Sequence, residues 1–194
     1  MLKVPVTVCD ARADTRLLLK AARAVAPCKV LDMGTGSGHI AIGLSLAGFD
    51  AEGCDICETA VRTALEHAAK AGSKARFFVS DLWRQTAEYD LVVFNPPLSG
   101  NPSGLKGLFR RLPLSEKLAF LHCIFFGGYR RQLLHRLVAG SKPHLRPGGR
   151  LMVLLTSPEL RDVRRLGDAH GFAFRVVEKS GQYRVAELAA RSVP

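Results

Sequence analysis

The chain has 194 residues, enough for one globular domain, and its 47% content of hydrophobic residues suffices for a full core. The formal net charge of +11 and the pI near 9.9 favour polyanionic partners such as RNA or the ribosome, although charge does not determine the fold. The absence of a secretory leader and of a long uncharged apolar run excludes a membrane span and predicts a cytoplasmic protein.

The five cysteines are odd in number and lie among apolar segments, as is typical of reduced thiols. Cys54 and Cys57 form a single C-x-x-C pair. A structural zinc site needs four ligands, and no second pair of cysteines or closely spaced histidines lies near this one in the sequence. We therefore expect no bound metal.

Short apolar runs alternate with helical segments along most of the chain. This pattern predicts an α/β fold in which crossover helices join parallel strands and cover both faces of the sheet. We expect all 194 residues to form this one domain. The expected elements are, in chain order, a helical lead-in over residues 1–27, strand Lys29–Met33, helix Gly38–Ala47, strand Ala51–Cys54, helix Thr59–Ala71, strand Ala75–Val79, strand Leu91–Phe94, helix Gly128–Gly140 and strand Arg150–Leu155.

The C-terminal region has a different pattern. Two β-prone runs, Phe172–Glu178 and Tyr183–Ala189, flank Lys179–Gln182, which predicts an antiparallel hairpin at the sheet edge. The stretch Ser99–Leu114 combines Gly, Pro, Ser and Asn with two arginines, which predicts a mobile loop beside the strand that precedes it.

A glycine-rich turn follows the first predicted strand. Gly34-Thr35-Gly36-Ser37-Gly38 comes directly after Asp32-Met33 and leads into an apolar helix. Because glycine has no Cβ, a ligand can approach the backbone closely at this carboxyl end of the strand. Asp55 ends the next strand, 21 residues after Gly34, where an acid accepts hydrogen bonds from a ribose diol. The alternative is a purely steric role for the glycines. The absence of a G-x-x-x-x-G-K-[ST] loop disfavours phosphate chemistry.

This arrangement resembles the class I S-adenosylmethionine-dependent methyltransferases over nearly the whole chain. The resemblance implies a Rossmann-like fold with a mostly parallel seven-stranded sheet, helices on both faces and a C-terminal antiparallel hairpin. It also implies S-adenosylmethionine as cofactor, with Asp55 on the ribose hydroxyls and Asp81, or its neighbour, on the adenine amino group. For Asp81, a helix cap is the alternative. The implied cofactor-binding residues are Asp32, Gly34, Thr35, Gly36, Gly38, Asp55, Ile56, Asp81, Leu82, Asn95 and Thr15.

The motif Asn95-Pro96-Pro97-Leu98 follows the strand that ends at Phe94, at the same sheet edge as the glycine turn. An amide or exocyclic amino nitrogen is a poor nucleophile because its lone pair is delocalised, and it becomes usable when acceptors hold its hydrogens. The Asn95 side-chain oxygen and the Pro96 carbonyl are the predicted catalytic acceptors, aligned in advance by the rigid proline rings. The alternative is a plain strand terminator and turn.

Relatives with this motif usually carry an aromatic residue after the second proline, where the ring stacks on the planar target. Here the position is Leu98, and Pro97 and Leu98 are the predicted substrate contacts. The departure leaves room for a different target atom or for lost activity. Trp83 or Tyr129 could supply a ring from elsewhere, although a place in or beside the core is the alternative.

Two further regions resemble the HemK-type glutamine methyltransferases, namely Cys9 to Leu19, and Gly127 to Arg130 together with Leu145 to Arg150. In that family an acid followed by a hydroxyl residue opens the helix before the glycine turn and lies near the cofactor. This implies such a role for Asp14 and Thr15, with a helix N-cap as the alternative. Fewer than about 30 residues precede the first motif, so the chain resembles the short form, which can rely on a small activating subunit.

The sequence therefore predicts methyl transfer from S-adenosylmethionine to the side-chain amide of a glutamine in a translation protein. The alternatives are an exocyclic nitrogen of adenine or guanine in RNA, a small metabolite, and a non-catalytic binding protein with the same fold. Six basic residues either steer RNA or form a solvated face. They are Lys106, Arg110, Arg111, Arg130, Arg131 and Arg136.

Overall fold

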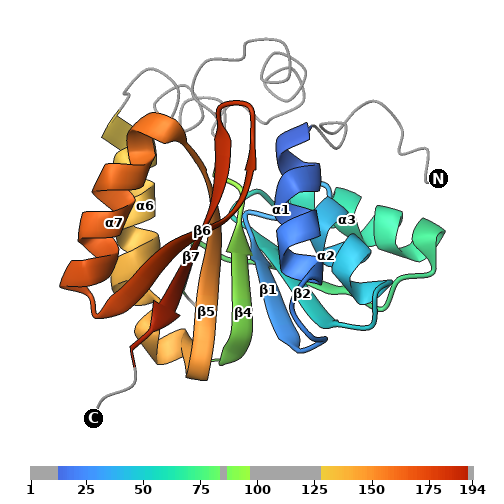
Figure 1. Cartoon of the computed structure of the whole chain (residues 1–194). Coiled ribbons are helices and arrows are strands. Elements are labelled where there is room, and N and C mark those ends of the chain that lie inside the picture. Colours follow the sequence, from blue (N-terminus) through green and yellow to red (C-terminus); the bar gives the residue numbers. More distant parts are fainter. Residues whose placement is uncertain (1–12, 84–86, 97–127, 192–194) are drawn as a thin grey trace.

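Seven strands form one sheet in the order β3-β2-β1-β4-β5-β7-β6 within the part of the chain that the computed structural model describes, residues 13–83, 87–96 and 128–191 (Figure 1). The strands β1 to β5 are parallel, and β7 is antiparallel to both β5 and β6. The elements are α1 (Ala13–Arg23), β1 (Lys29–Met33), α2 (His39–Ser45), β2 (Asp50–Asp55), α3 (Glu58–Ala71), β3 (Arg76–Val79), β4 (Tyr89–Phe94), α6 (Gly128–Gly140), η1 (Lys142–His144), β5 (Leu145–Thr156), η2 (Ser157–Glu159), α7 (Leu160–Ala169), β6 (Phe172–Ser180) and β7 (Tyr183–Ala190).

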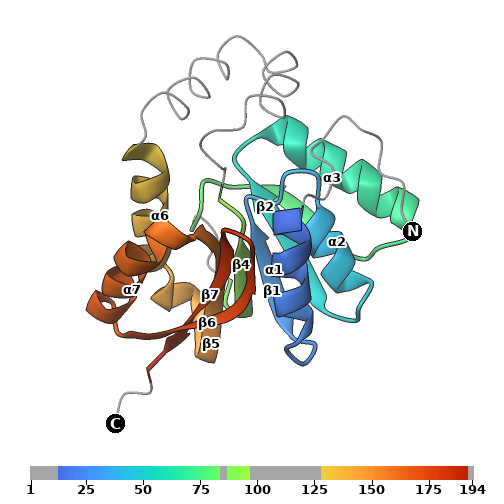
Figure 2. The ribbon, with the colours of Figure 1, turned by 45° about the horizontal axis from the view of Figure 1, so that its top comes forward.

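The two faces of the sheet are buried by different helices. Alternate residues of each central strand point to opposite faces, so that Val30 packs beneath α1 and α2 while Leu31 packs beneath α6 and α7. Figures 1 and 2 show α1, α2 and α3 on one side of the sheet and α6 and α7 on the other. No helix of the described residues is long and apolar enough to span a membrane.

The structure confirms the predicted class of fold and corrects several boundaries. β5 begins at Leu145 rather than Arg150, because the Pro147-Gly148-Gly149 stretch, which is typical of a turn, continues the strand beside β4 across a register shift. β6 extends to Ser180, which leaves only Gly181 and Gln182 as the hairpin turn. Residues 99–114, predicted as a mobile loop, lie outside the described residues, and the assignment of the whole chain to one domain stays a prediction.

Helix α7 has no counterpart among the elements expected from the sequence. Five of its ten residues are charged, so its apolar residues form only a narrow stripe. Val163 and Gly167 of this stripe are buried against the sheet. Gly167 is so close to β7 that a Cβ on it would lie 2.9 Å from the Leu188 side chain. The spacing of Leu160, Val163 and Leu166 is the signal that would have indicated this helix.

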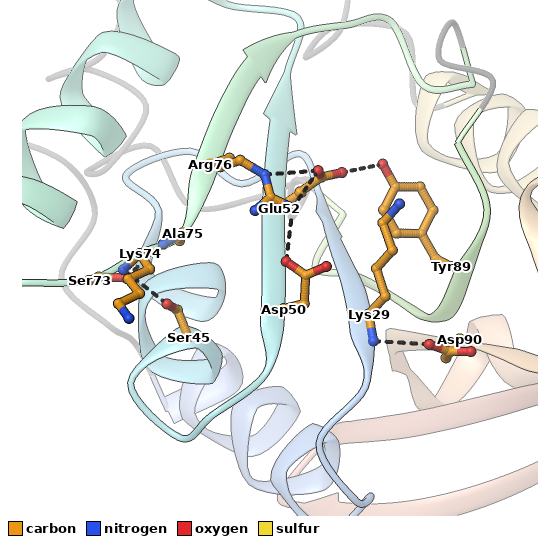
Figure 3. A network of polar contacts seen from close by, with 10 residues as sticks. All are labelled: Lys29, Ser45, Asp50, Glu52, Ser73, Lys74, Ala75, Arg76, Tyr89 and Asp90. Carbon is orange, nitrogen blue, oxygen red and sulfur yellow. Dashed lines mark hydrogen bonds and ion pairs between the residues drawn. The ribbon is translucent and has the colours of Figure 1, made fainter.

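A polar network ties β2, β3 and β4 together (Figure 3). The Tyr89 hydroxyl donates to Glu52 Oε2 at 2.6 Å, and the Arg76 guanidinium donates to Glu52 Oε1 at 2.9 Å and to Asp50 at 2.8 Å. Burial, followed by the bond to Glu52, raises the pKa of Tyr89. The Lys29 ammonium lies 5.0 Å from the centre of the Tyr89 ring, which links β1 to the same network.

The register of the parallel strands brings three strand ends to one edge of the sheet. Met33 lies opposite Cys54 of β2 and opposite Phe94 of β4. The residues that follow these positions are therefore neighbours, although the sequence separates them widely. Figure 2 turns this edge toward the viewer.

Gly53 of β2 is a close-packed position below this edge. A Cβ on Gly53 would lie 2.7 Å from the Phe77 ring and 2.7 Å from Thr35 Oγ1, closer than side chains can approach. We expect Gly53→Ala to lower the free energy of unfolding by about 1–3 kcal/mol, as overpacking does. Denaturant unfolding measures the change.

A double-mutant cycle with Phe77→Leu tests the cause. The smaller side chain makes room for the new methyl group, so the double variant should lose less stability than the sum of the two single changes. Additive losses, or a Gly53→Ala protein as stable as the wild type, would show that the contact with Phe77 does not limit this position.

Candidate functional site

The buried carboxylate of Asp32 holds the glycine turn through hydrogen bonds. This carboxylate accepts hydrogen bonds from Thr35 Oγ1 at 2.6 Å and from the Ala41 N–H at 3.2 Å, and only 2% of the residue is exposed. The Thr35 N–H donates to the Cys54 carbonyl at 2.8 Å, which ties the turn to β2. Burial raises the pKa of Asp32 to about 7, although both hydrogen bonds oppose the rise. Asp32 and Thr35 thus hold the turn in place.

The three glycines of the turn have different surroundings, although all have positive φ angles. A Cβ on Gly34 would lie 3.2 Å from the Phe94 ring, and one on Gly38 would lie 3.0 Å from Ala64. A Cβ on Gly36 would have no atom of the described residues within 4 Å. The Gly36 backbone therefore faces open space, which is the property that a ligand-binding turn requires.

Asp55 lies beside Gly36 at the end of β2. Its carboxylate accepts hydrogen bonds from the Gly36 N–H at 2.9 Å and from the Cys57 N–H at 3.0 Å. Burial raises the pKa of Asp55, and these N–H groups oppose the rise. A carboxylate has about four acceptor sites, so capacity remains for a hydroxyl donor of a ligand. The next residue, Ile56, is 65% exposed and presents an apolar surface beside this carboxylate.

Asp81 and Leu82 follow β3 at the same edge. Asp81 Oδ2 accepts a hydrogen bond from Arg136 of α6 at 2.9 Å, so the candidate adenine-binding acid already has a cationic partner. No described residue directly after Asp81 is helical, so the structure does not support the helix-cap interpretation. Leu82 has a φ of 52° although it is not glycine, a strained conformation of the kind that clusters at functional sites. The Ser80 hydroxyl donates to the Leu82 carbonyl at 3.0 Å and stabilises this turn.

The amide nitrogen of the Asn95 side chain has a hydrogen-bond partner, whereas the amide oxygen has none among the described residues. Its Nδ2 donates to Thr15 Oγ1 at 3.2 Å, and the Thr15 N–H donates to the carboxylate of buried Asp14 at 2.7 Å. The Asn95 Oδ1 atom is buried and has no hydrogen-bond partner among the described residues. Nearly all buried polar atoms are paired, so an orphaned acceptor at this edge indicates a donor that the described residues do not supply.

The Pro96 carbonyl accepts a hydrogen bond from Arg130 Nη1 of α6 at 3.1 Å. Arg130 is 8% exposed and pairs with Glu159, so its side chain is not part of a solvated or RNA-facing surface. Arg131 is exposed and lies 3.7 Å from Asp162, while Arg136 pairs with Asp81. The remaining candidates fall outside the described residues, namely Pro97, Leu98, Lys106, Arg110 and Arg111.

Trp83 packs beside the core and does not supply a free ring. Its Nε1 donates to the Leu137 carbonyl at 2.9 Å, and its ring stacks on His144 with 4.9 Å between the ring centres. The structure does not describe the side chain of Tyr129. Within the described ranges, no group of three His, Cys, Asp or Glu side chains could hold a metal ion. Cys54 is buried, and its sulfur lies 3.4 Å from the sulfur of Met33.

Residues 8–111 match the family model described as methyltransferase small domain. The release factor glutamine methyltransferase of Cereibacter sphaeroides is 33% identical over 169 residues, which cover 84% of this chain and 59% of that protein. A Methanocaldococcus jannaschii protein, provisionally named protein N5-glutamine methyltransferase, is 33% identical over 162 residues, 80% of this chain and 76% of that protein. Ribosomal RNA small subunit methyltransferase C of Alcanivorax borkumensis is 29% identical over 160 residues, 82% of this chain and 41% of that protein.

The chain thus spans only about half the length of the two bacterial relatives. Among solved structures, the 16S rRNA N2 G1207 methyltransferase of T. thermophilus in complex with AdoMet and guanosine superposes with a TM-score of 0.66 at 20% identity. The superposition covers 94% of this chain and 44% of that one. This likeness confirms the Rossmann-like fold of class I methyltransferases, with its C-terminal antiparallel hairpin.

The buried Asp32 carboxyl should make stability depend on pH. Its pKa rises from 3.8 in the unfolded chain to about 7 in the fold, so the native state binds more protons between these values. The free energy of unfolding therefore falls as pH rises through this range, by on the order of 4 kcal/mol if the full shift is realised. Asp32→Asn removes this contribution, and denaturant unfolding between about pH 4 and pH 8 measures the difference in slope.

Thr35→Val provides the matched variant. It removes the hydroxyl that favours the charged form of Asp32, so the fall in stability that Asp32 causes should extend to higher pH. Equal slopes in the wild type and Asp32→Asn would show that Asp32 is already ionised throughout this range.

Proposed function

Because the chain belongs to the methyltransferase small domain family, we propose that it transfers a methyl group from S-adenosylmethionine to a planar nitrogen, the side-chain amide of a glutamine in a translation protein. The Oδ1 atom of Asn95 carries this proposal. It is a buried acceptor that no described residue supplies with a donor, and it lies at the edge that also holds the glycine turn. The glutamine methyltransferases among the relatives support the choice of acceptor.

The residues at this edge fit S-adenosylmethionine. The open space at Gly36 gives a ligand access to the backbone, and the Asp55 carboxylate has acceptor capacity left for the ribose diol. Exposed Ile56 offers an apolar surface for the adenine ring, and the turn from Ser80 to Leu82 lies at the same edge of the sheet. Arg136 occupies one acceptor site of the Asp81 carboxylate, so Asp81 keeps capacity for the adenine amino group, with the Leu82 backbone beside it.

When bound, S-adenosylmethionine supplies a methyl group that leaves its positive sulfur for the acceptor nitrogen, while the carbon–sulfur electron pair stays on sulfur. Asn95 Oδ1 and the Pro96 carbonyl would hold the two amide hydrogens, which directs the nitrogen lone pair toward the methyl carbon. Thr15 fixes the orientation of the Asn95 amide. No strong base is needed, because the alkylated nitrogen readily loses a proton afterwards.

The second candidate acceptor is an exocyclic nitrogen of an RNA base. The net charge of +11 and the ribosomal RNA methyltransferase among the relatives favour it. Both acceptors are planar nitrogens that the same pair of oxygens could hold. A small activating subunit and a cytoplasmic location stay predictions from the sequence.

Two substitutions separate cofactor binding from methyl transfer. Asp55→Ala should weaken S-adenosylmethionine binding by about tenfold or more, the loss expected for hydrogen bonds to a charged group. Although the resemblance also implies a cofactor contact for Asn95, Asn95→Ala should abolish transfer while cofactor affinity stays nearly intact, since its Oδ1 atom, unpaired among the described residues, holds a hydrogen of the target nitrogen. Isothermal calorimetry and transfer of labelled methyl groups measure the two effects.

Asp50→Ala is the control, because it removes a carboxylate from the exposed start of the same strand β2. It should leave cofactor binding unchanged. A wild-type protein that does not bind S-adenosylmethionine, or binding that survives Asp55→Ala undiminished, would contradict the proposed enzyme. Loss of cofactor binding in Asn95→Ala would contradict the role of Asn95.

The class of acceptor can be determined in cell extract. We expect incubation of the protein with labelled S-adenosylmethionine and fractionated extract to place the label on a protein of the translation apparatus. The label should then resist ribonuclease and be released by protease. Asn95→Ala serves as the blank. Label that resists protease but not ribonuclease would reject the glutamine acceptor in favour of RNA.

A further inference from the structure

Arg130 lies at the centre of a buried hydrogen-bond network that the proposed reaction does not yet use. Its side chain is 9% exposed, and its Nη1 donates to the Pro96 carbonyl at 3.1 Å. The Nε and Nη2 atoms donate to the two carboxylate oxygens of Glu159, with 2.9 Å between Nη2 and Oε2. A buried guanidinium is costly to desolvate, and the bidentate pair with Glu159 compensates that cost.

Glu159 is itself held in place by the end of β5. Its Oε2 atom accepts hydrogen bonds from the Thr156 N–H and from Thr156 Oγ1, both at 2.7 Å, in a capping box at η2. Burial opposes ionisation of Glu159, but the bonds from Arg130 and Thr156 outweigh it and lower its pKa. Since β5 pairs directly with β4, this chain of contacts fixes the guanidinium relative to the strand that carries Asn95 and Pro96.

The contact leaves the Pro96 carbonyl able to accept a second hydrogen bond. A carbonyl oxygen has two lone pairs, and Arg130 occupies one of them. On the neighbouring residue, Asn95 Nδ2 donates to Thr15, and Oδ1 has no partner in the part of the chain that the structure describes. Both residues at the end of β4 are thus held by a side chain from a helix: Asn95 donates to Thr15 of α1, and the Pro96 carbonyl accepts from Arg130 of α6.

The pairing with Glu159 also matters for charge. A lone guanidinium here would place a positive charge near the end of β4, beside the residues that would hold the positively charged cofactor. The carboxylate of Glu159 neutralises that charge at hydrogen-bond distance. The pair therefore orients the carbonyl without adding a net positive charge to the site.

We propose that Arg130 is a positioning residue, which holds the Pro96 carbonyl in one orientation so that its second lone pair receives a hydrogen of the acceptor nitrogen. This inference rests on the proposed function. Arg130 does not touch the substrate in this scheme, and its effect passes through Pro96. The loss of Arg130 therefore affects the turnover number, since a misplaced Pro96 carbonyl lowers the rate of methyl transfer more than it lowers cofactor binding.

Arg130→Lys is the sharpest variant. It keeps the positive charge, but an ammonium group on a flexible chain cannot maintain both the two-pronged contact with Glu159 and the bond to Pro96. We expect kcat to fall by about tenfold to a hundredfold, while the dissociation constant for S-adenosylmethionine stays unchanged. Arg131→Lys, the neighbouring and 80% exposed arginine, is the matched control and should behave as the wild type.

A second measurement tests the hydrogen bond between Arg130 and the Pro96 carbonyl without an activity assay. The chain contains a single Pro-Pro bond, Pro96–Pro97, so protein labelled with ¹³C′,¹⁵N-proline gives one directly bonded ¹³C′–¹⁵N correlation, which reports the Pro96 carbonyl. Loss of the hydrogen bond from Arg130 should move the ¹³C′ resonance to lower frequency in Arg130→Lys and leave it in place in Arg131→Lys. Glu159→Gln, whose amide turns a donor toward Arg130, should move it in the same direction and serves as the test if Arg130→Lys does not fold.

The outcomes separate the two hypotheses. An active wild type together with undiminished kcat in folded Arg130→Lys and Glu159→Gln would overturn the positioning role, as would an unmoved Pro96 resonance. An equal loss of activity in Arg131→Lys would also overturn it. A wild type that binds no S-adenosylmethionine and transfers no methyl group would instead show that the proposed function has failed.

Discussion

The candidate site depends on the parallel pairing of β1 with β2 on one side and with β4 on the other. The chain leaves β1 toward β2 and β3, then returns to add β4 on the opposite side of β1. Crossover connections diverge at such a switch point, which leaves a crevice at the carboxyl ends of the strands. Gly34, Asp55 and Asn95 directly follow or end these three strands, so another strand order would separate the glycine turn from the proposed acceptor motif.

Both helical layers then act on the end of β4. From the α1 side, Thr15 bonds the Asn95 amide, and from the α6 side, Arg130 bonds the Pro96 carbonyl. Each layer is fixed by its own apolar cluster against one sheet face. The two neighbouring acceptors are therefore held by opposite sides of the molecule. Such orientation before the ligand arrives lowers the entropy that a reaction has to spend on alignment.

Three features of the candidate site lower the free energy of unfolding. Asp32 is buried beneath the turn with its pKa raised to about 7, Leu82 adopts a left-handed backbone conformation, and Asn95 Oδ1 has no partner among the described residues. All three lie at the carboxyl edge of the sheet. The opposite half of the strands carries a satisfied network instead, in which Tyr89, Glu52 and Arg76 pair with one another (Figure 3). Proteins commonly retain such unfavourable features where a ligand binds.

The sequence by itself determined the α/β class, the central strands, the C-terminal hairpin, the glycine turn, and the positions of Asp55 and Asn95 at strand ends. These features are local, because apolar periodicity and the backbone preferences of glycine and proline act over a few residues. The sequence did not reveal helix α7, whose apolar stripe is narrow, or the early start of β5, which runs through a proline-glycine stretch.

Only the tertiary structure decided the partners of the polar side chains. Arg130 belongs to a run of basic residues that is typical of a solvated face, yet it is buried with Glu159, which is 29 residues away in the sequence. Asp81 pairs with Arg136, and Thr15 meets Asn95 across 80 residues. Such contacts depend on which strands and helices become neighbours. That choice is made by the packing of the whole sheet between its two helical layers and not by any local pattern.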